Sequence, residues 1–176
     1  MIYFDDGNII LRAMLKSDRQ NFVHAFAEQN WHKPLELFNE YYNQQENGEK
    51  AVIVAEVNNE VAGYVTLLPF ATMGPFAYKN IPELVDLNVL MKFQKKGIGN
   101  KLMDIVEELA KEHSDHISLA VGLHDGYGAA QRIYVKRGYI PDGTGAWYRG
   151  KQLEQYAECA NDDDLILYFL KDLHNS

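Results

Sequence analysis

Apolar positions along the chain follow two different spacings, and these predict strands interleaved with helices. Consecutive or alternating apolar residues predict strands over 9–12, 51–57, 61–68, 84–90, 117–121 and 165–170. Apolar residues at helical spacing predict helices that begin near Ser17, at Pro34, after Gly97 and near Ala129. The resulting order, β α α β β β α β α β β, is typical of a mixed α/β sheet and not of a doubly wound parallel one.

The segments between these elements carry turn signals. Asn58-Asn59 lies between two apolar runs and predicts a β-hairpin. Residues 69–81 form a long connection without periodicity, and such loops often carry function in compact domains. Gly138 is expected to end a helix. A glycine-rich turn is expected between short strand segments at 139–140 and 147–148.

Composition and charge narrow the class of protein. A net charge of −8 argues against a general nucleic-acid binder, which normally carries a basic face. The single Cys159 excludes an internal disulfide and fits a reducing compartment. No stretch has the length or apolarity of a signal peptide or a membrane span. We therefore expect one cytoplasmic domain over 1–176, with no membrane and no nucleic-acid partner.

The junction between the 84–90 strand and the next helix has the chemistry of an anion site. Lys95 and Lys96 precede Gly97 and Gly99, and an amphipathic helix follows with an expected buried stripe of Ile98, Leu102, Ile105 and Leu109. Glycines at this point let the backbone approach a ligand, and the first amides of a helix attract pyrophosphate. An ordinary tight connection is the alternative interpretation.

Two familiar phosphate motifs do not fit this junction. A Walker loop requires Gly-Lys-Ser/Thr after four intervening residues, which the sequence lacks. A dinucleotide fingerprint requires a third glycine where Leu102 stands. The anion must therefore belong to another kind of ligand.

Two motifs resemble those of the GNAT N-acetyltransferase superfamily. The first is Gln94-Lys95-Lys96-Gly97-Ile98-Gly99, which is similar to the family's Gln/Arg-x-x-Gly-x-Gly/Ala at a strand-to-helix turn. The second is the segment 129–139, which ends in Gly138-Tyr139 and resembles the family's second cofactor helix. The element order agrees from about residue 9 to residue 170, and the specific motifs lie between 82 and 139.

The resemblance implies a fold and a co-substrate. The expected fold is a mixed, mostly antiparallel sheet, splayed between the strands around 83–90 and 117–121, with helices on both faces. Acetyl-CoA would be the acyl donor. Its pyrophosphate would be held by Lys95, Lys96, Gly97, Ile98, Gly99 and Asn100. Its pantetheine arm would bond to main-chain groups of Leu87, Asn88 and Val89.

One position departs from the family pattern. Many relatives carry an asparagine seven residues before the second motif's tyrosine, where it contacts CoA. This chain has Tyr127 there, between Gly126 and Gly128. Tyr127 is therefore a cofactor-binding candidate whose contact could instead come from backbone.

Acyl transfer to an amine requires a base for the amine and an acid for the leaving thiolate. Glu83 is the first choice of base, because the family often places a carboxylate there; a solvated strand end is the alternative. Asp86 is the second: it faces the substrate cleft, or neighbouring backbone satisfies it. Tyr134 matches the family's tyrosine acid and would otherwise be a core aromatic.

His113, His116, His124 and Asp125 suggest a metal site only weakly. His113 and His116 straddle an expected helix end and strand start, so they share no face. We therefore expect no metal.

The leading hypothesis is transfer of an acetyl group from acetyl-CoA to a primary amine of a small molecule or peptide, in a ternary complex. The alternatives are a non-catalytic CoA-binding module of the same fold and an acyltransferase for longer acyl chains. Aromatic residues of the N-terminal helices could surround a cationic amine, although core packing is their commoner use; they are Phe22, Phe26, Trp31, Phe38 and Tyr41. Dimers through the late strands are common for such folds, so a homodimer stays open.

Overall fold

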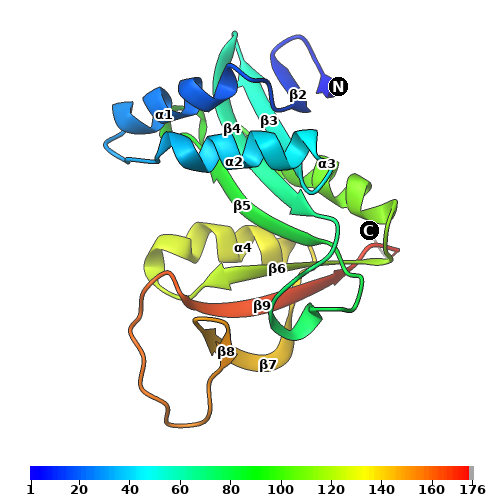
Figure 1. Cartoon of the computed structure of the whole chain (residues 1–176), viewed down its shortest axis with the longest axis vertical. Coiled ribbons are helices and arrows are strands. Elements are labelled where there is room, and N and C mark those ends of the chain that lie inside the picture. The colour runs from blue at the N-terminus through cyan, green and yellow to red at the C-terminus, as the bar shows by residue number, and fades with distance from the viewer. Residues whose placement is uncertain (175–176) are drawn as a thin grey trace. The chain divides into compact units, whose positions relative to one another are not determined.

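The computed structural model describes residues 1–174, which form four α-helices and nine strands (Figure 1). The chain divides into two compact units. The first unit contains Met1–Leu68 and Val85–Leu109, and the second contains Pro69–Leu84 and the chain from Ala110 onward. The strand order is β1-β2-β3-β4-β5-β6-β9-β7-β8, and β5 (Glu83–Val89) contributes residues to both units.

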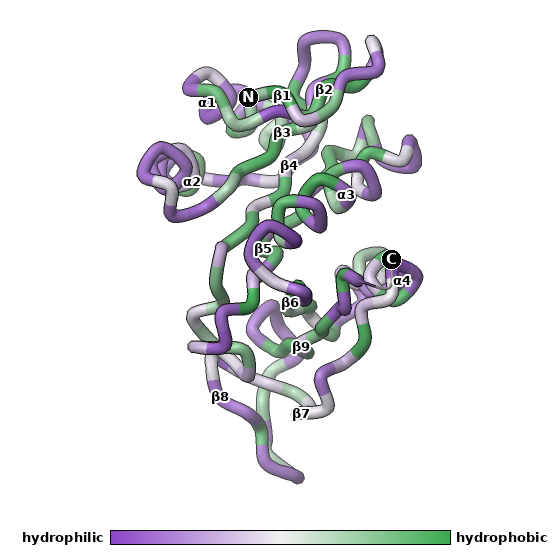
Figure 2. Tube along the Cα trace, turned by 90° about the vertical axis from the view of Figure 1, so that its right-hand side faces the viewer, coloured by the Kyte–Doolittle hydropathy of each residue, from purple (hydrophilic) through white to green (hydrophobic). Residues whose placement is uncertain are grey.

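The first unit is built on an antiparallel meander of four strands that leads into β5. These strands are β1 (Ile2–Asp5), β2 (Ile9–Ala13), β3 (Ala51–Val57) and β4 (Glu60–Leu68). Helices α1 (Asp18–Glu28) and α2 (Leu35–Glu46) lie on one side of β3 and β4, and α3 (Ile98–Lys111) lies on the other (Figures 1 and 2). Because β3 and β4 are covered on both sides, their sequences are nearly continuous runs of apolar residues.

Four fully buried aromatic side chains join α1 and α2 to the sheet. The Phe22 ring stacks on Phe38 at 5.3 Å and meets Tyr64 of β4 edge-on at 5.1 Å. Phe26 completes the group. Edge-on and offset stacked rings add to the stability that burial already provides. The two helices predicted from Ser17 and Pro34 are therefore present because their aromatic stripes face a common sheet.

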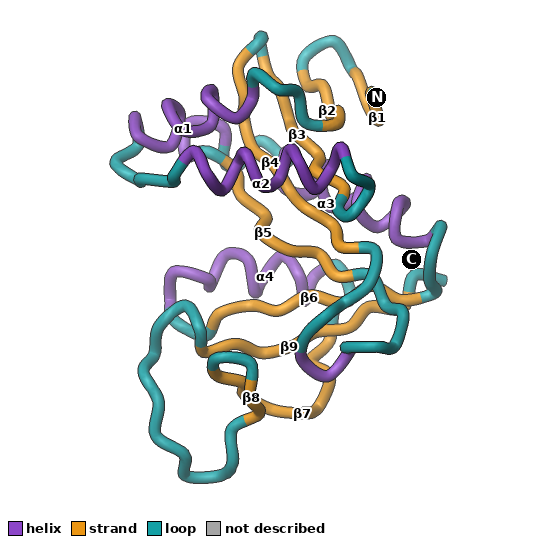
Figure 3. Tube along the Cα trace, in the orientation of Figure 1, coloured by secondary structure: helices purple, strands orange, loops and turns teal. Residues whose placement is uncertain are grey.

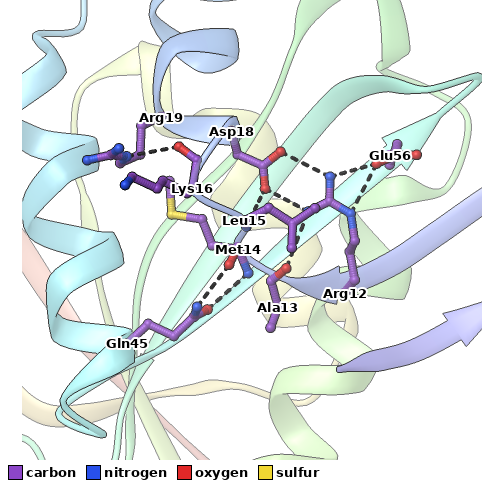
Figure 4. Close-up of polar contacts among 9 residues, drawn as sticks. All are labelled: Arg12, Ala13, Met14, Leu15, Lys16, Asp18, Arg19, Gln45 and Glu56. Carbon is purple, nitrogen blue, oxygen red and sulfur yellow. Dashed lines mark hydrogen bonds and ion pairs between the residues drawn. The ribbon is translucent and has the colours of Figure 1, made fainter.

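A buried ion cluster fixes the start of α1 (Figure 4). The Arg12 guanidinium of β2 bonds Asp18 of α1 and Glu56 of β3, each at 2.6 Å. The Asp18 carboxylate also accepts the Leu15 amide at 2.7 Å. Ser17 makes no side-chain cap bond. The helix start that the sequence suggested at Ser17-Asp18 therefore depends on Asp18.

The buried face of α3 differs from the expected stripe. Ile98 and Leu102 are buried as predicted, whereas Ile105 and Leu109 are only half-buried. Met103, Val106 and Ala110 complete the buried face. The buried face of α3 therefore contains more than one residue per turn and is centred closer to Met103 than expected. Residues three and four positions apart lie on the same face of a helix, so these positions are neighbours.

The second unit contains one parallel pairing and several antiparallel ones. Its elements are β6 (His116–Gly122), α4 (Gly128–Lys136), β7 (Ile140–Tyr148), β8 (Lys151–Gln152) and β9 (Leu165–Asp172). Glu83 and Leu84 pair in parallel with Ser118 and Leu119, while β6 pairs with β9 antiparallel. The predicted mixed α/β, mostly antiparallel sheet is therefore confirmed.

The glycine-rich turn expected between the short strands at 139–140 and 147–148 is wrong. Residues 140–148 form one strand, β7, whose register against β9 shifts between Pro141 and Ala146. Gly143 and Gly145 adopt positive φ within the shift, so the glycines form an irregular bulge and the turn itself comes after Tyr148. The short strands β1 and β8 were not predicted, because two to four residues carry too little periodicity.

The 69–81 connection packs against β9. Ala71 and Phe76 form a small buried cluster with Tyr168, and Phe76 lies in the 3₁₀ turn η1 (Gly74–Phe76). A Cβ on Gly74 would lie 2.2 Å from the Tyr168 ring, so only glycine permits this approach. Among residues 1–174, none of the helices has the length and apolarity needed to cross a bilayer.

Candidate active site

The glycine turn adopts the conformation that an anion cradle requires. Gly97 has φ +79°, and nothing lies within 4 Å of the position that a Cβ would take. Its carbonyl accepts the Lys101 amide at 3.1 Å, which closes the first turn of α3. The amides of Ile98 and Gly99 fall in that first turn, outside the i→i−4 hydrogen bonds of the helix. This helix start has the open, amide-rich surface expected for pyrophosphate.

Gln94 and Gly99 connect this turn to the end of β5. The Gln94 side-chain amide donates to the Val89 carbonyl at 3.0 Å. A Cβ built on Gly99 would lie 3.7 Å from a Val89 methyl, an ordinary contact that alanine could make. The structure therefore brings together Val89 and Gly99, predicted to hold the pantetheine and the pyrophosphate, respectively.

The turn is also locally basic in an acidic chain. Lys95 and Lys96 are exposed, and Lys95 itself has φ +61°. The ammonium groups of Lys92 and Lys96 lie over the Phe93 ring, at 5.1 and 5.4 Å from its centre. A cluster of lysines beside a helix N-terminus favours a multiply charged anion.

Asp86 lies in β5, eleven residues before Gly97, and its carboxylate accepts bonds from four side-chain donors. It has φ +52° in the middle of β5, a left-handed conformation that few non-glycine residues adopt. Its carboxylate accepts the hydroxyls of Tyr41 and Tyr64, each at 2.7 Å. It also accepts the side-chain amide of Asn88 and lies 3.5 Å from the Lys33 ammonium. Side chains satisfy Asp86, in place of the neighbouring backbone that was one of the two alternatives expected from the sequence.

Lys33 is the cation of this cluster, and aromatic rings surround it. Its ammonium donates to the Tyr64 hydroxyl at 2.7 Å. It also lies over the rings of Phe26, Trp31 and Tyr64, at 5.0–5.4 Å from their centres. Burial lowers the pKa of Lys33 below its ordinary value, although the Asp86 charge opposes the shift. The aromatic residues that could have surrounded a substrate amine thus surround the chain's own Lys33.

The same cluster raises the pKa of two tyrosines. Burial raises the pKa of Tyr64 and of Tyr41 far above the ordinary value, and the negative charge of Asp86 adds to both shifts. Both hydroxyls therefore remain protonated donors at any physiological pH.

Glu83 begins β5 in the second unit and is half-buried. The residue before it is fixed: the Pro82 carbonyl accepts both the amide and the hydroxyl of Ser118, at 2.8 and 3.0 Å. The pKa of Tyr168 is raised mainly by burial and then by the charges of Glu83 and Asp142. Glu83 therefore lies at an ordered strand end, close enough to Tyr168 to contribute to the raised pKa of that tyrosine.

Tyr134 lies on α4 and is 6% exposed. Its ring centre is 5.9 Å from that of Tyr139, and its carbonyl accepts the amides of Arg137 and Tyr139. The residue thus packs at the helix C-terminus, just before Gly138 at φ +87°.

Tyr127 contacts the long loop between β8 and β9, which Figure 3 draws in teal. Its hydroxyl bonds the Asp163 carboxylate at 3.1 Å, and His124 bonds the same oxygen at 2.8 Å. His124 also accepts the Gly126 amide through Nδ1. Tyr127, a cofactor-binding candidate by the family resemblance, is therefore bonded within the second unit. Among residues 1–174, no three His, Cys, Asp or Glu side chains converge as a metal site.

Sequence reasoning missed three members of the Asp86 cluster: Lys33, Tyr41 and Tyr64. A usable signal was present, since an aspartate inside an apolar strand requires buried donors, and a tyrosine in a buried strand requires a polar partner. The sequence did not show which tyrosines would meet Asp86, because Tyr41 and Lys33 come from segments more than forty residues away.

Comparison with known proteins agrees with this geometry. The family model of the acetyltransferase (GNAT) family matches residues 12–139. The chain therefore belongs to the GNAT acetyltransferase family. This confirms the predicted family, which is a family of acetyltransferases.

A curated relative supports the same family. An uncharacterized N-acetyltransferase, YhfO, from Bacillus subtilis (strain 168) is 30% identical over 98 residues, which are 55% of this chain. The match spans about 63% of that relative's length.

Solved structures share the fold. An N-acetyltransferase from Staphylococcus aureus Mu50 has a TM-score of 0.71 at 16% identity, over 95% of this chain and 99% of its own. The acetyltransferase yncA from Salmonella typhimurium, described as putative and solved with its cofactor acetyl-CoA, has a TM-score of 0.69 at 15% identity, over 95% of both chains. At these identities the likeness concerns the fold.

Proposed function

We propose that this protein transfers an acetyl group from acetyl-CoA to a primary amine of a small molecule or peptide, and that residues 1–176 act as one N-acetyltransferase domain. The observation that carries the proposal is the turn at Gly97, with its positive φ, open approach and following helix start. Lys95, Lys96, Gly97, Ile98, Gly99 and Asn100 hold the pyrophosphate. Main-chain groups of Leu87, Asn88 and Val89 hold the pantetheine arm.

Glu83 is the base in this proposal, in preference to Asp86. Asp86 already accepts from two tyrosine hydroxyls, an amide and an ammonium group, so taking a further proton would disrupt that arrangement. The amine nitrogen attacks the thioester carbonyl and Glu83 takes its proton. The C–S bond then breaks, and the Tyr134 hydroxyl donates a proton to the departing thiolate.

Two glycines separated by one residue, Gly97 and Gly99, provide a matched test of the cofactor site. Alanine at Gly97 must adopt a left-handed φ, whereas alanine at Gly99 meets only an ordinary contact with Val89. Since the left-handed conformation costs about 1–2 kcal/mol, Gly97→Ala should weaken CoA binding by roughly tenfold. Gly99→Ala should bind CoA nearly as the wild type does, by isothermal titration calorimetry. Equal losses in the two variants would contradict the proposed use of the turn.

Turnover is tested by release of free thiol from acetyl-CoA in the presence of a panel of amines. Tyr134→Phe should lower kcat about 10²-fold, the lower range for one acid or base group. Glu83→Gln should lower kcat and remove the acidic limb of the pH profile. Binding of CoA without thiol release across the panel would favour a non-catalytic module, and faster release from longer acyl-CoAs would favour a different acyl donor.

A further inference from the structure

The Lys33 cage is a complete ammonium site within the first unit. Three ring faces and one carboxylate surround the Lys33 nitrogen, which is the chemistry used to bind alkylammonium ligands. Two walls remain partly open: Trp31 is 47% exposed, and the Asp86 side chain is 22% exposed. The Asp86 carboxylate and the three ring faces favour a cation between them, and Lys33, from the segment between α1 and α2, supplies it.

The cage is joined to the strand that the proposed function assigns to the cofactor. Lys33 donates to the Tyr64 hydroxyl, and that hydroxyl donates to Asp86. Asn88 donates from its side chain to both Asp86 and Tyr64. The cluster thus holds β5 by hydrogen bonds to the side chains of Asp86 and Asn88, on either side of Leu87.

The backbone of β5 adopts an unfavourable conformation at Asp86 that the surrounding contacts must stabilise. Asp86 has a positive φ in the middle of a strand, a conformation that persists only where the surroundings determine it. On the other side, Gly63 of β4 lies so close to Asn88 that a Cβ would meet its carbonyl oxygen at 2.5 Å. The path of residues 86–89 is therefore set by side chains around Asp86 together with close backbone packing.

We propose that Lys33 is a positioning residue for acetyl-CoA binding: its caged ammonium holds Asp86, and through it the 87–89 backbone, in the conformation that receives the pantetheine arm. This inference rests on the proposed function. Lys33 itself contacts no cofactor atom in this account. Because its ammonium fills the cage, the cage does not serve as the acceptor site in the wild-type protein.

The test uses CoA affinity and an external amine. In Lys33→Ala, CoA binding measured by isothermal titration calorimetry should weaken by about tenfold, a usual size for coupling between sites. Adding n-propylammonium, which replaces the deleted part of the side chain, should restore the affinity. Tetramethylammonium at equal ionic strength should not, because it has no N–H group to donate to Tyr64. Wild-type affinity should respond to neither salt.

Arg19→Ala is the matched control. Arg19 also places a cation over a ring, Tyr42, at 5.3 Å and bonds Asn39 at 2.7 Å, so it joins the same two helices. Its guanidinium bonds the Lys16 carbonyl and Asn39, and neither bond involves Asp86. CoA affinity in Arg19→Ala should therefore equal that of the wild type.

A second variant protects the test if Lys33→Ala folds poorly. Tyr64→Phe keeps the ring of the cage and removes the hydroxyl that links Lys33 to Asp86. It should weaken CoA binding in the same direction, and n-propylammonium should not restore it.

The outcomes separate the two proposals. Wild-type protein that binds no CoA overturns the proposed function and this inference with it. Wild-type protein that binds CoA, together with an unaffected Lys33→Ala, overturns the inference alone. A loss in Lys33→Ala that n-propylammonium fails to restore also overturns it, since the missing group would then not be an ammonium ligand.

Discussion

Two arginines, one in each unit, each face a pair of carboxylates. The Arg12 side chain is 11% exposed and bonds Asp18 and Glu56, each at 2.6 Å. The Arg149 side chain is 67% exposed and lies 4.0 Å from Asp162 and 3.3 Å from Asp164. The first pair of carboxylates comes from α1 and β3, whereas the second comes from one loop.

The two clusters contain the same number of carboxylates, so their number does not set their contribution to stability. What differs is how deeply the charged groups are buried and whether the carboxylates come from different segments of the fold. Water screens Arg149 and solvates its partners if it is removed. Asp18 is 1% exposed, so loss of Arg12 would leave a charge with little access to water. Arg12 thus joins three segments of the first unit, β2, α1 and β3, whereas Arg149 contacts the carboxylates of one exposed loop in the second.

The largest expected effect is that of removing Arg12. Arg12→Met should lower the free energy of unfolding by about 3–5 kcal/mol, because a buried ion pair is broken on one side. Arg149→Met should change it by about 0–1 kcal/mol. Urea unfolding followed by circular dichroism measures both. Similar losses in the two variants would show that burial does not separate the two clusters.

A smaller loss is expected at the second buried cluster of the first unit. Asp86→Asn should lower the free energy of unfolding by about 2–3 kcal/mol near neutral pH, less than Arg12→Met, because Lys33 can release its proton. Burial already lowers the pKa of Lys33, and without Asp86 it falls further. Between that pKa and about 10.4 the unfolded chain binds more protons, so the variant should regain stability as pH rises. A loss independent of pH would contradict this account.

Alkaline pH should act on Tyr41 and Tyr64. Their pKa values are raised by burial and by Asp86, so the stability linked to their ionisation is complete below pH 10. Above about pH 10 it should fall by about 1.4 kcal/mol per pH unit for each, since only the unfolded chain releases their protons. Tyr41→Phe should reduce this slope by one proton in urea titrations at several pH values. An unchanged slope in that variant would place the effect elsewhere.

The smallest effect is expected at the exposed cluster of His124, Tyr127 and Asp163. Asp163→Asn should change the free energy of unfolding by about 0.5 kcal/mol or less. Amide exchange in the 153–164 loop should nevertheless become faster, because two bonds to that loop are lost. Unchanged exchange would mean that the loop is ordered by other contacts.

How much of the site could be predicted from the sequence is clear from a comparison of the Gly97 turn with the cluster around Asp86. Gln94, Gly97 and the amphipathic α3 lie within a short segment, so local turn chemistry and periodicity were enough to predict them. Three of the four donors to Asp86 were not predictable, because Tyr41, Tyr64 and Lys33 come from α2, β4 and the α1–α2 connection and meet it only through tertiary packing. The same limit explains Tyr127, whose partner Asp163 lies 36 residues away.

One error in the predicted fold has a similar cause. The strand at 140–148 was broken by its glycines in the sequence, but β9 pairs with it on both sides of the bulge. Pairing across the chain overrides local preference at this point. The buried face of α3 is a different kind of error, because Met103, Val106 and Ala110 were apolar positions of the sequence that the expected stripe left out.

The division of the chain also separates its two tryptophans, since Trp31 lies in the first unit and Trp147 in the second. The Trp31 indole is half-exposed beside the Lys33 ammonium, whereas the Trp147 indole donates to Thr144 and packs on Tyr168. Each unit therefore contains its own intrinsic fluorophore in a different polarity. Single-tryptophan proteins made by Trp31→Phe or Trp147→Phe would report the melting of each unit as a separate optical signal.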